Sequence, residues 1–328
     1  MAFLKSKLNL GLSGTPFSSP LSPFAVFRFL DKSIFSEILP TGKVSTSFQL
    51  YKLKYCIYGG FENRQVIEYI NQGDLNEKIH SITHRIKTED VIELPPFQHI
   101  TIEVEMKPQA MKAYNVFKKS ALLEFENGKE LTAANVLVKH LRLAQIASGT
   151  VKDDDGTPHL IDNTKLIALK DLIIGIDEPI VIFTRFRAEV VQIEEMINKF
   201  KREGEVERTV CKIVGGCDER EKFASGEADI AIVNVASGGV GLNELAKCNY
   251  SIYFSSGYDS LLYEQSLART RRSGSIVAEK VFYYHIVAVG TIDEVIMVAI
   301  EKKIDIVSAV LEDFKGSLQG GHEARGIF

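Results

Sequence analysis

A glutamine and two arginines share one face of a predicted helix in the stretch Gln265–Gly274. Gln265, Arg269 and Arg272 follow one another at intervals of four and three residues, so their side chains project from the same side of the helix. Neighbouring guanidinium groups stay charged and bind pairs of oxygen atoms, which suits a phosphoryl group in transfer. The same pattern also fits a solvated basic helix end, which the helix dipole favours. The segments upstream favour the phosphate site.

The elements that would position this helix alternate regularly from residue 163 onward. Short runs rich in valine and isoleucine predict strands at 180–184, 209–214, 229–234, 251–254 and 281–287. Amphipathic patterns predict helices at 163–174, 187–202, 218–224 and 260–272, and a last helix that begins at Thr291, which has the capping-box spacing with Glu294. This alternation predicts an α/β fold with a parallel sheet that helices cover on both faces.

The first half of the chain is less regular. Helices are expected at 23–35, 108–126 and 131–147, short helices within 65–90, and a strand at 99–106. Residues 11–23 are rich in glycine, serine and proline and are expected to form a loop.

Three polar segments follow predicted strands and would therefore meet at the carboxyl edge of the sheet, where ligands bind in such folds. They are Thr184-Arg185, the glycine-rich stretch from Ser237 to Asn243, and the arginine helix. Glycines at a strand-to-helix turn let the backbone approach a phosphate closely. The glycine stretch alone is weak evidence, but three such segments in order are much stronger.

With these segments in place, the chain resembles superfamily 2 helicases and ATPases of the Swi/Snf-like branch. Ile180–Phe186 resembles motif IV of that family, Asn234–Asn243 motif V, and Glu264–Arg272 motif VI. Leu12–Pro16 resembles motif III, and Arg85–Val91 with Leu94-Pro95-Pro96 resembles the segment between the two lobes. The resemblance covers nearly the whole chain, from the end of the first RecA-like lobe through the second. It implies a remnant of the first lobe at 1–95, a strand and helical inter-lobe segment at 96–150, the second lobe at 151–315 and a flexible tail at 316–328.

The resemblance also implies a role for each matching residue. Arg272, as the arginine finger, and Arg269 would reach the γ-phosphate of ATP, and Gln265 would organise the helix at the nucleotide. The other implied sites are nucleotide binding at Gly239 and Gly241; nucleic-acid phosphate contacts at Thr184, Arg185, Ser237, Gly238 and Asn243; and coupling of hydrolysis to lobe movement at Ser13, Gly14 and Thr15. Two positions depart from the family pattern: Ala236 stands where a lysine is frequent, and Arg271 where a histidine is frequent.

Two parts of an ATP site are expected to be missing. A P-loop requires G-x-x-x-x-G-K-[ST], and the nearest stretch has Val44 in place of the hydroxyl residue and Glu37 in place of the first glycine. The acidic pairs Asp177-Glu178 and Asp293-Glu294 do not follow buried strands and are expected to be solvated loop and cap residues. No metal ligand is therefore assigned. ATP and Mg²⁺ are expected as cofactors only with a separate polypeptide that carries the P-loop half.

Composition limits the class of partner. The 328 residues are 45% apolar and 25% charged, with a net charge of −4 and four cysteines in no C-x-x-C pair. These values predict reduced cysteines and only local contacts to nucleic acid. No apolar run has the length of a membrane span and no signal core is seen near the N-terminus, so the expected location is the cytoplasm, or wherever the host keeps its DNA, neither secreted nor in a membrane. The expected nucleic acid is DNA, most readily a duplex.

Three functions fit to different degrees. The first is the C-terminal part of a DNA-dependent ATPase or helicase, a function that needs two arginines directed at a nucleotide. The second is a non-catalytic adaptor that binds DNA or protein and does not need that pair. The third is a dinucleotide or nucleotide-sugar enzyme, which lacks its G-x-G-x-x-G turn here.

Overall fold

A computed structural model describes residues 8–14, 20–59, 65–84, 86, 90–126, 133–153, 155–204, 207–235, 242–257, 259–272 and 280–302. The chain divides into two compact units, Met1–Val91 and Ile92–Phe328. The predicted subdivision at residues 95, 150 and 315 stays a prediction. No described helix is both long enough and apolar enough to cross a membrane.

Unit 1 is built from short elements around a small aromatic core. Its elements are α1 (Pro23–Leu30), β1 (Glu37–Ile38), β2 (Val44–Ser45), α2 (Phe48–Tyr55), β3 (Cys56–Gly59), β4 (Gln65–Tyr69) and α3 (Gln72–Ser81). Rings of α1, the following turn and α2 pack against one another, and those of Phe35 and Tyr51 meet edge to face with 4.8 Å between their centroids. The two hairpins, β1–β2 and β3–β4, are separate two-stranded sheets. Because such sheets are marginal alone, the helices and the core supply most of the unit's stability.

Two predictions in unit 1 differ from the structure. The first helix ends at Leu30 instead of residue 35, since the chain turns back at Asp31, whose carboxylate accepts a hydrogen bond from the Ser33 amide at 2.7 Å. Residues 65–69 form the strand β4 instead of a short helix, because this β-branched stretch pairs antiparallel with β3. Unit 1 also exposes large apolar side chains, among them Leu53 at 72% and Ile67 at 67%.

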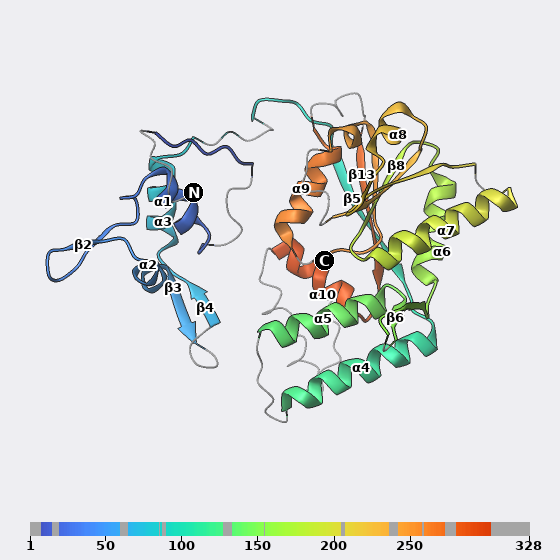
Figure 1. The fold of residues 1–328 in the computed structure, drawn as a ribbon, viewed down its shortest axis with the longest axis horizontal. Helices are drawn as coiled ribbons and strands as arrows, with labels where there is room; N and C mark the ends of the chain where they lie inside the picture. Colours follow the sequence, from blue (N-terminus) through green and yellow to red (C-terminus); the bar gives the residue numbers. More distant parts are fainter. Residues whose placement is uncertain are drawn as a thin grey trace. The chain divides into compact units, whose positions relative to one another are not determined.

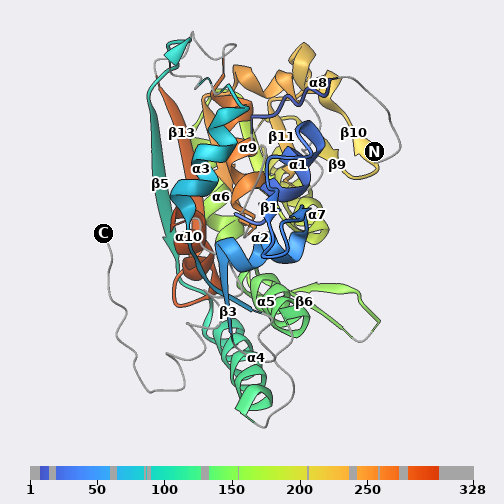
Figure 2. The same ribbon diagram turned by 90° about the vertical axis from the view of Figure 1, so that its left-hand side faces the viewer.

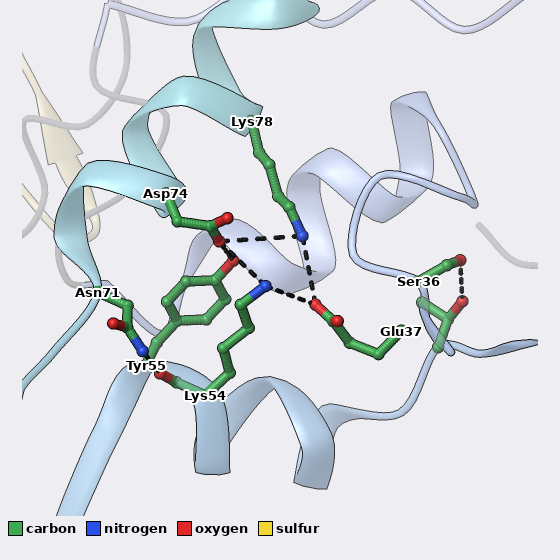
Figure 3. Close-up of polar contacts among 8 residues, drawn as sticks. Ser36, Glu37, Lys54, Tyr55, Asn71, Asp74 and Lys78 are labelled. Carbon is green, nitrogen blue, oxygen red and sulfur yellow. Dashed lines mark hydrogen bonds and ion pairs between the residues drawn. The ribbon is translucent and has the colours of Figure 1, made fainter. Parts of the chain in front are cut away.

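A cluster of alternating charges fixes the helices of unit 1 to its first strand (Figure 3). Lys54 Nζ lies 2.8 Å from Glu37 Oε1 and 3.2 Å from Asp74 Oδ2, while Lys78 Nζ lies 3.3 Å from the same Glu37 oxygen. Tyr55 donates its hydroxyl to Asp74 Oδ2 at 2.5 Å. The Lys54 hydrogen bond holds the pKa of Glu37 below its usual value. Burial acts to raise the pKa of Asp74, but the hydrogen bonds from Tyr55 and Lys54 outweigh it, so that pKa is also lowered.

We expect acid to destabilise unit 1 selectively. Both carboxyl groups have lower pKa values in the folded state, so their contribution is present above their unfolded values, about 4 to 4.5, and is lost as the pH falls through the folded values. The stability of α2 and α3, followed by amide hydrogen exchange corrected for the intrinsic pH dependence of exchange, should stay level from about pH 7 to 5 and fall below that. The double substitution Glu37→Gln and Asp74→Asn should make the loss of stability below about pH 5 smaller. Glu77→Gln, an exposed carboxylate of the same helix α3, should not. If the stability of the double variant falls as steeply with acid as that of the wild type, groups other than Glu37 and Asp74 cause the acid sensitivity.

Unit 2 contains a sheet of seven described strands. Its elements are β5 (Phe97–Val104), α4 (Pro108–Glu126), α5 (Ala133–Ala147), β6 (Thr150–Lys152), β7 (Pro158–Leu160), α6 (Thr164–Gly175), β8 (Ile180–Thr184), α7 (Arg187–Glu203), β9 (Val210–Val214), β10 (Cys217–Asp218), α8 (Arg220–Ser225), β11 (Ile230–Asn234), η3 (Asn243–Lys247), β12 (Tyr250–Tyr253), α9 (Ser260–Thr270), β13 (Val281–Ala288) and α10 (Ile292–Lys302). The strand order is β10-β9-β11-β8-β12-β13-β5, parallel except for β10. The two central strands β8 and β11 are buried at every position, which explains their uninterrupted apolar sequences.

Helices cover both faces of this sheet, as predicted (Figure 1). One core lies between the sheet and α6, α7 and α10, and is continued outward by α4 and α5. The other core lies between the sheet and α8, η3 and α9. Strand β5 forms the edge beside β13 and pairs with it in register over all eight residues (Figure 2). A segment predicted to lie between lobes therefore contributes a strand to this sheet.

A buried ion pair joins two helices of the first core. Lys165 in α6 and Asp293 in α10 are 4% and 7% exposed, and Lys165 Nζ lies 2.5 Å from Asp293 Oδ2. The same carboxylate oxygen accepts the amide of Ala288 at 3.1 Å. The expectation that Asp293 is a solvated cap residue is therefore wrong: the carboxylate points inward, where a lysine compensates its charge. Thr291 does cap α10, since its hydroxyl accepts the Asp293 amide at 3.2 Å.

Candidate phosphate site around the arginine helix

The arginine helix is α9, and its local sequence sets both ends. Asp259 caps the beginning, where its Oδ1 accepts the amides of Leu261 and Leu262 at 3.0 and 3.1 Å. At the other end the amide of Arg271 donates to the carbonyl of Leu267 at 3.2 Å. The helix thus ends at Thr270, two residues before Arg272, so that side chain follows the helix terminus instead of standing on the helix as predicted.

Hydroxyl groups hold one face of α9 on the sheet. The side chains at 263, 266 and 270 lie one helical turn apart and face β12 and β13. Tyr253 and Ser266 share a hydrogen bond of 2.7 Å, and the hydroxyls of Ser251 and Thr270 one of 3.3 Å. Tyr283 donates its hydroxyl to the backbone carbonyl of Leu267 at 3.0 Å. Because this face is fixed, the opposite face of α9 has a defined direction.

A stack of aromatic rings supports the middle of the same helix. His285, 1% exposed, lies parallel to Tyr253 with 4.8 Å between the ring centroids, and its Nε2 is 3.1 Å from His99 Nδ1 and 3.3 Å from the hydroxyl of Tyr263. Burial, with a smaller effect from His99, lowers the pKa of His285 to about 3. The ring is therefore neutral near pH 7 and acts as a hydrogen-bonding support under α9.

Gln265 and Arg269 lie on the side of α9 next to the bonded face and line a recess at the carboxyl ends of β8 and β11. The recess is lined by Phe183, Val233, Val235, Leu242, Leu262, Gln265, Ser266 and Arg269. Within the described residues, the Nε of Arg269 is buried without a hydrogen-bond partner. A buried guanidinium nitrogen that lacks an acceptor fits an anionic oxygen, which a phosphate would supply. The predicted pairing of Gln265 with Arg269 on one face is therefore present in the structure.

The last two arginines of this stretch contact different parts of unit 2. Arg272 Nη1 donates to Asn243 Oδ1 at 2.5 Å, so two predicted site residues from separate segments meet. Arg271 Nε donates to the carbonyl of Pro95 at 2.8 Å, and its guanidinium lies 4.7 Å from the centroid of the Phe97 ring. Arg271, noted only as a departure from the family pattern, is thus bound to the segment before β5.

The turn after β8 is held by residues that the sequence reasoning missed. Glu189 Oε2 accepts the amides of Arg185 and Phe186, each at 3.0 Å, and the hydroxyl of Ser255 at 2.6 Å. Asn234 Nδ2 donates to the carbonyl of Arg185 at 2.9 Å. The ends of β8, β11 and β12 are therefore joined at Arg185. An acidic residue in the first turn of the helix that follows β8 is the signal that could have identified Glu189.

The remaining predicted site residues are buried, exposed or outside the described residues. Thr184 is fully buried and its hydroxyl donates to the carbonyl of Val233 at 3.4 Å, so its side chain offers no surface to a nucleic acid here. Ser13 and Gly14 are exposed residues of unit 1. Thr15, Ser237, Gly238, Gly239 and Gly241 lie outside the described residues. Among the side chains that the structure does describe, no group of three His, Cys, Asp or Glu could hold a metal ion.

Comparison with solved structures identifies the fold. The C-terminal part of the Fun30 ATPase domain matches with a TM-score of 0.53 and 14% identity, over 70% of this chain and 100% of that one. The SWI2/SNF2 ATPase core of Sulfolobus solfataricus, solved in complex with double-stranded DNA, matches with a TM-score of 0.50 and 18% identity, over 94% of this chain and 64% of that one. The α/β fold is therefore RecA-like and is that of a Swi2/Snf2 ATPase C-terminal lobe, as the resemblance of the motifs implied.

Comparison with curated sequences gives two distant relatives. A putative protein, p41, of Acyrthosiphon pisum secondary endosymbiont phage 1 is 26% identical over 242 residues, which cover 72% of this chain and 50% of that protein. An uncharacterized ATP-dependent helicase of Mycoplasma genitalium is 25% identical over 319 residues, which cover 94% of this chain and 28% of that protein. No family model matches the chain. The chain thus spans half the length of one relative and under a third of the other.

Proposed function

We propose that this chain is the C-terminal part of a DNA-dependent ATPase of the Swi2/Snf2 type. The observation that carries the proposal is the orientation of α9, whose hydroxyl-bonded face fixes Gln265 and Arg269 toward the recess and leaves the Arg269 Nε without a partner among the described residues. The likeness in fold to a Swi2/Snf2 ATPase C-terminal lobe supports the same function. ATP-dependent translocation or remodelling of DNA is the activity that this part would serve.

Each residue has a task in this proposal. Arg269 and Arg272 donate to the phosphate oxygens and offset the charge that develops on them, and Gln265 orients the helix at the nucleotide. Gly239 and Gly241 allow the backbone to approach the nucleotide. ATP with Mg²⁺ supplies the phosphoryl group, held mainly by a polypeptide that carries the P-loop half. Ser13, Gly14 and Thr15 would couple the reaction to movement of that half.

DNA contacts are assigned to the loops at the carboxyl edge of the sheet. Arg185, Ser237, Gly238 and Asn243 would meet backbone phosphates, which gives binding without base specificity. We leave out the side chain of Thr184 because it is buried. The complex of the Sulfolobus solfataricus core with double-stranded DNA supports a duplex as the ligand.

The test is complementation. The chain is mixed with a polypeptide that carries a P-loop half, and ATP hydrolysis is measured with and without duplex DNA. We expect neither polypeptide alone to hydrolyse ATP and the mixture to do so, faster with DNA and more slowly as salt is added. DNA binding by this chain without any hydrolysis in the mixture would instead favour a non-catalytic adaptor. Hydrolysis by the chain alone would contradict the need for a second half.

A further inference from the structure

Arg271 differs from its neighbours because its side chain leaves the phosphate site. Its Nε donates to the carbonyl of Pro95 at 2.8 Å, and its guanidinium carbon lies 4.7 Å from the centroid of the Phe97 ring. A guanidinium can donate in its plane while its face lies against an aromatic ring, which a lysine ammonium cannot do as well. One side chain therefore contacts two residues of the segment that enters β5.

That segment is held rigidly on its other side. Pro95 and Pro96 fix their own φ angles and donate no amide hydrogen bonds. The carbonyl of Pro96 accepts the amide of Val281 at 2.9 Å, and β5 then pairs with β13 from Phe97 onward. The segment begins four residues after the boundary between the two units at Val91 and Ile92. Arg271 thus connects the C-terminal end of α9 to the chain that joins unit 2 to unit 1.

We propose that Arg271 is a positioning residue that fixes the end of the arginine helix to the segment joining the two units. This inference rests on the proposed function, since the groups it positions are Arg269 and Arg272. The body of α9 is bound independently, through Ser266, Leu267 and Thr270. Loss of Arg271 therefore loosens only the end of α9 and the residues that follow it, Arg272 included, and the fold remains.

Amide hydrogen exchange on the full chain tests the contact without ATP. Arg271→Ala should speed exchange of the amides at 269–272 by about tenfold, the effect of losing one hydrogen bond and one cation–π contact. Phe97→Leu, which removes only the ring, should speed it less, and Arg271→Lys should restore part of the protection. Arg142→Ala, an arginine of α5 that donates to Gln145 at 3.5 Å, is the matched control and should change nothing at 269–272. Unchanged exchange in Arg271→Ala overturns the proposal. If Arg271→Ala does not fold, the exchange of Phe97→Leu decides whether the contact holds the end of α9.

The kinetics of ATP hydrolysis by the mixture of this chain with the P-loop polypeptide then show whether Arg271 positions the reacting arginines or only stabilises the helix. Arg271→Ala should lower kcat about tenfold and leave the KM for ATP unchanged, with partial recovery in Arg271→Lys, because the end of α9 is misplaced while the nucleotide still binds. Faster exchange with a normal kcat would overturn the positioning role. If the wild-type mixture has no ATPase activity, the proposed function fails, and the exchange result alone decides whether Arg271 fixes the helix end.

Discussion

Substitution of Arg272 by alanine is expected to lower the kcat of the complemented ATPase by at least about 10³-fold, the usual effect of losing an arginine finger. The residue lies at the end of α9, and its guanidinium donates to Asn243 Oδ1 at 2.5 Å, so a partner is at hand that orients it without neutralising its charge. An amide oxygen is a weaker acceptor than an anionic phosphate oxygen, so the guanidinium is able to transfer to a nucleotide. Steady-state ATP hydrolysis with the P-loop polypeptide measures the effect.

Two further variants define what the Arg272 result means. Arg272→Lys should recover little activity, because an ammonium group does not bind two oxygens in a plane. Arg220→Ala removes an arginine of the same unit, paired with Asp218 at 2.6 Å on the surface, and should leave kcat within about twofold. A kcat for Arg272→Ala equal to that of Arg220→Ala would remove Arg272 from the reaction.

Substitution of Lys165 by methionine is expected to destabilise unit 2 by about 3–5 kcal/mol, because it leaves the buried carboxylate of Asp293 without a counter-charge. Lys165 Nζ also donates to the carbonyl of Phe254 at 3.2 Å, so α6, α10 and the end of β12 lose a common partner. Urea unfolding followed by circular dichroism, with the midpoint and the slope fitted separately, measures the loss.

A second substitution identifies the cause of that loss. The double variant Lys165→Met and Asp293→Asn should recover much of the stability, since an amide keeps an acceptor for the Ala288 amide and carries no charge. Lys199→Met is the matched control: its exposed pair with Glu203, at 3.8 Å, should change the free energy of unfolding by less than about 0.5 kcal/mol. A double variant as unstable as the single one would point to lost packing instead of uncompensated charge.

The parts of the fold that sequence predicted well are those where a single physical signal dominates. The runs predicted at 180–184 and 229–234 correspond to β8 and β11, which are buried at every position, so their apolar composition alone predicted strands there. The helix at 108–126 is long enough for its apolar period to be clear. By contrast, residues 65–69 contain β-branched side chains but are too few for their period to decide between helix and strand, and the pairing with β3 settles the outcome.

The candidate site shows the same limit. Spacing on one helix placed Gln265 and Arg269 on one face, and the structure directs both to the recess. Spacing could not show that Arg272 meets Asn243, or that Arg271 reaches Pro95, since those partners lie 29 and 176 residues away. It also could not show that Asp293 is buried, because its counter-charge comes from a helix more than 100 residues earlier in the chain. Long-range partners decided the outcome at each of these positions.

The hydroxyl bonds beneath α9 determine how the two arginines can move. Aliphatic side chains tolerate small sliding between packed elements, but the hydrogen bonds that join Ser266, Thr270 and the Leu267 carbonyl to the sheet are directional and share one registration along it. A shift of the helix by one turn, about 5.4 Å, would break all of them together. The height of Arg269 above the strands is therefore fixed by the registration of α9 on the sheet.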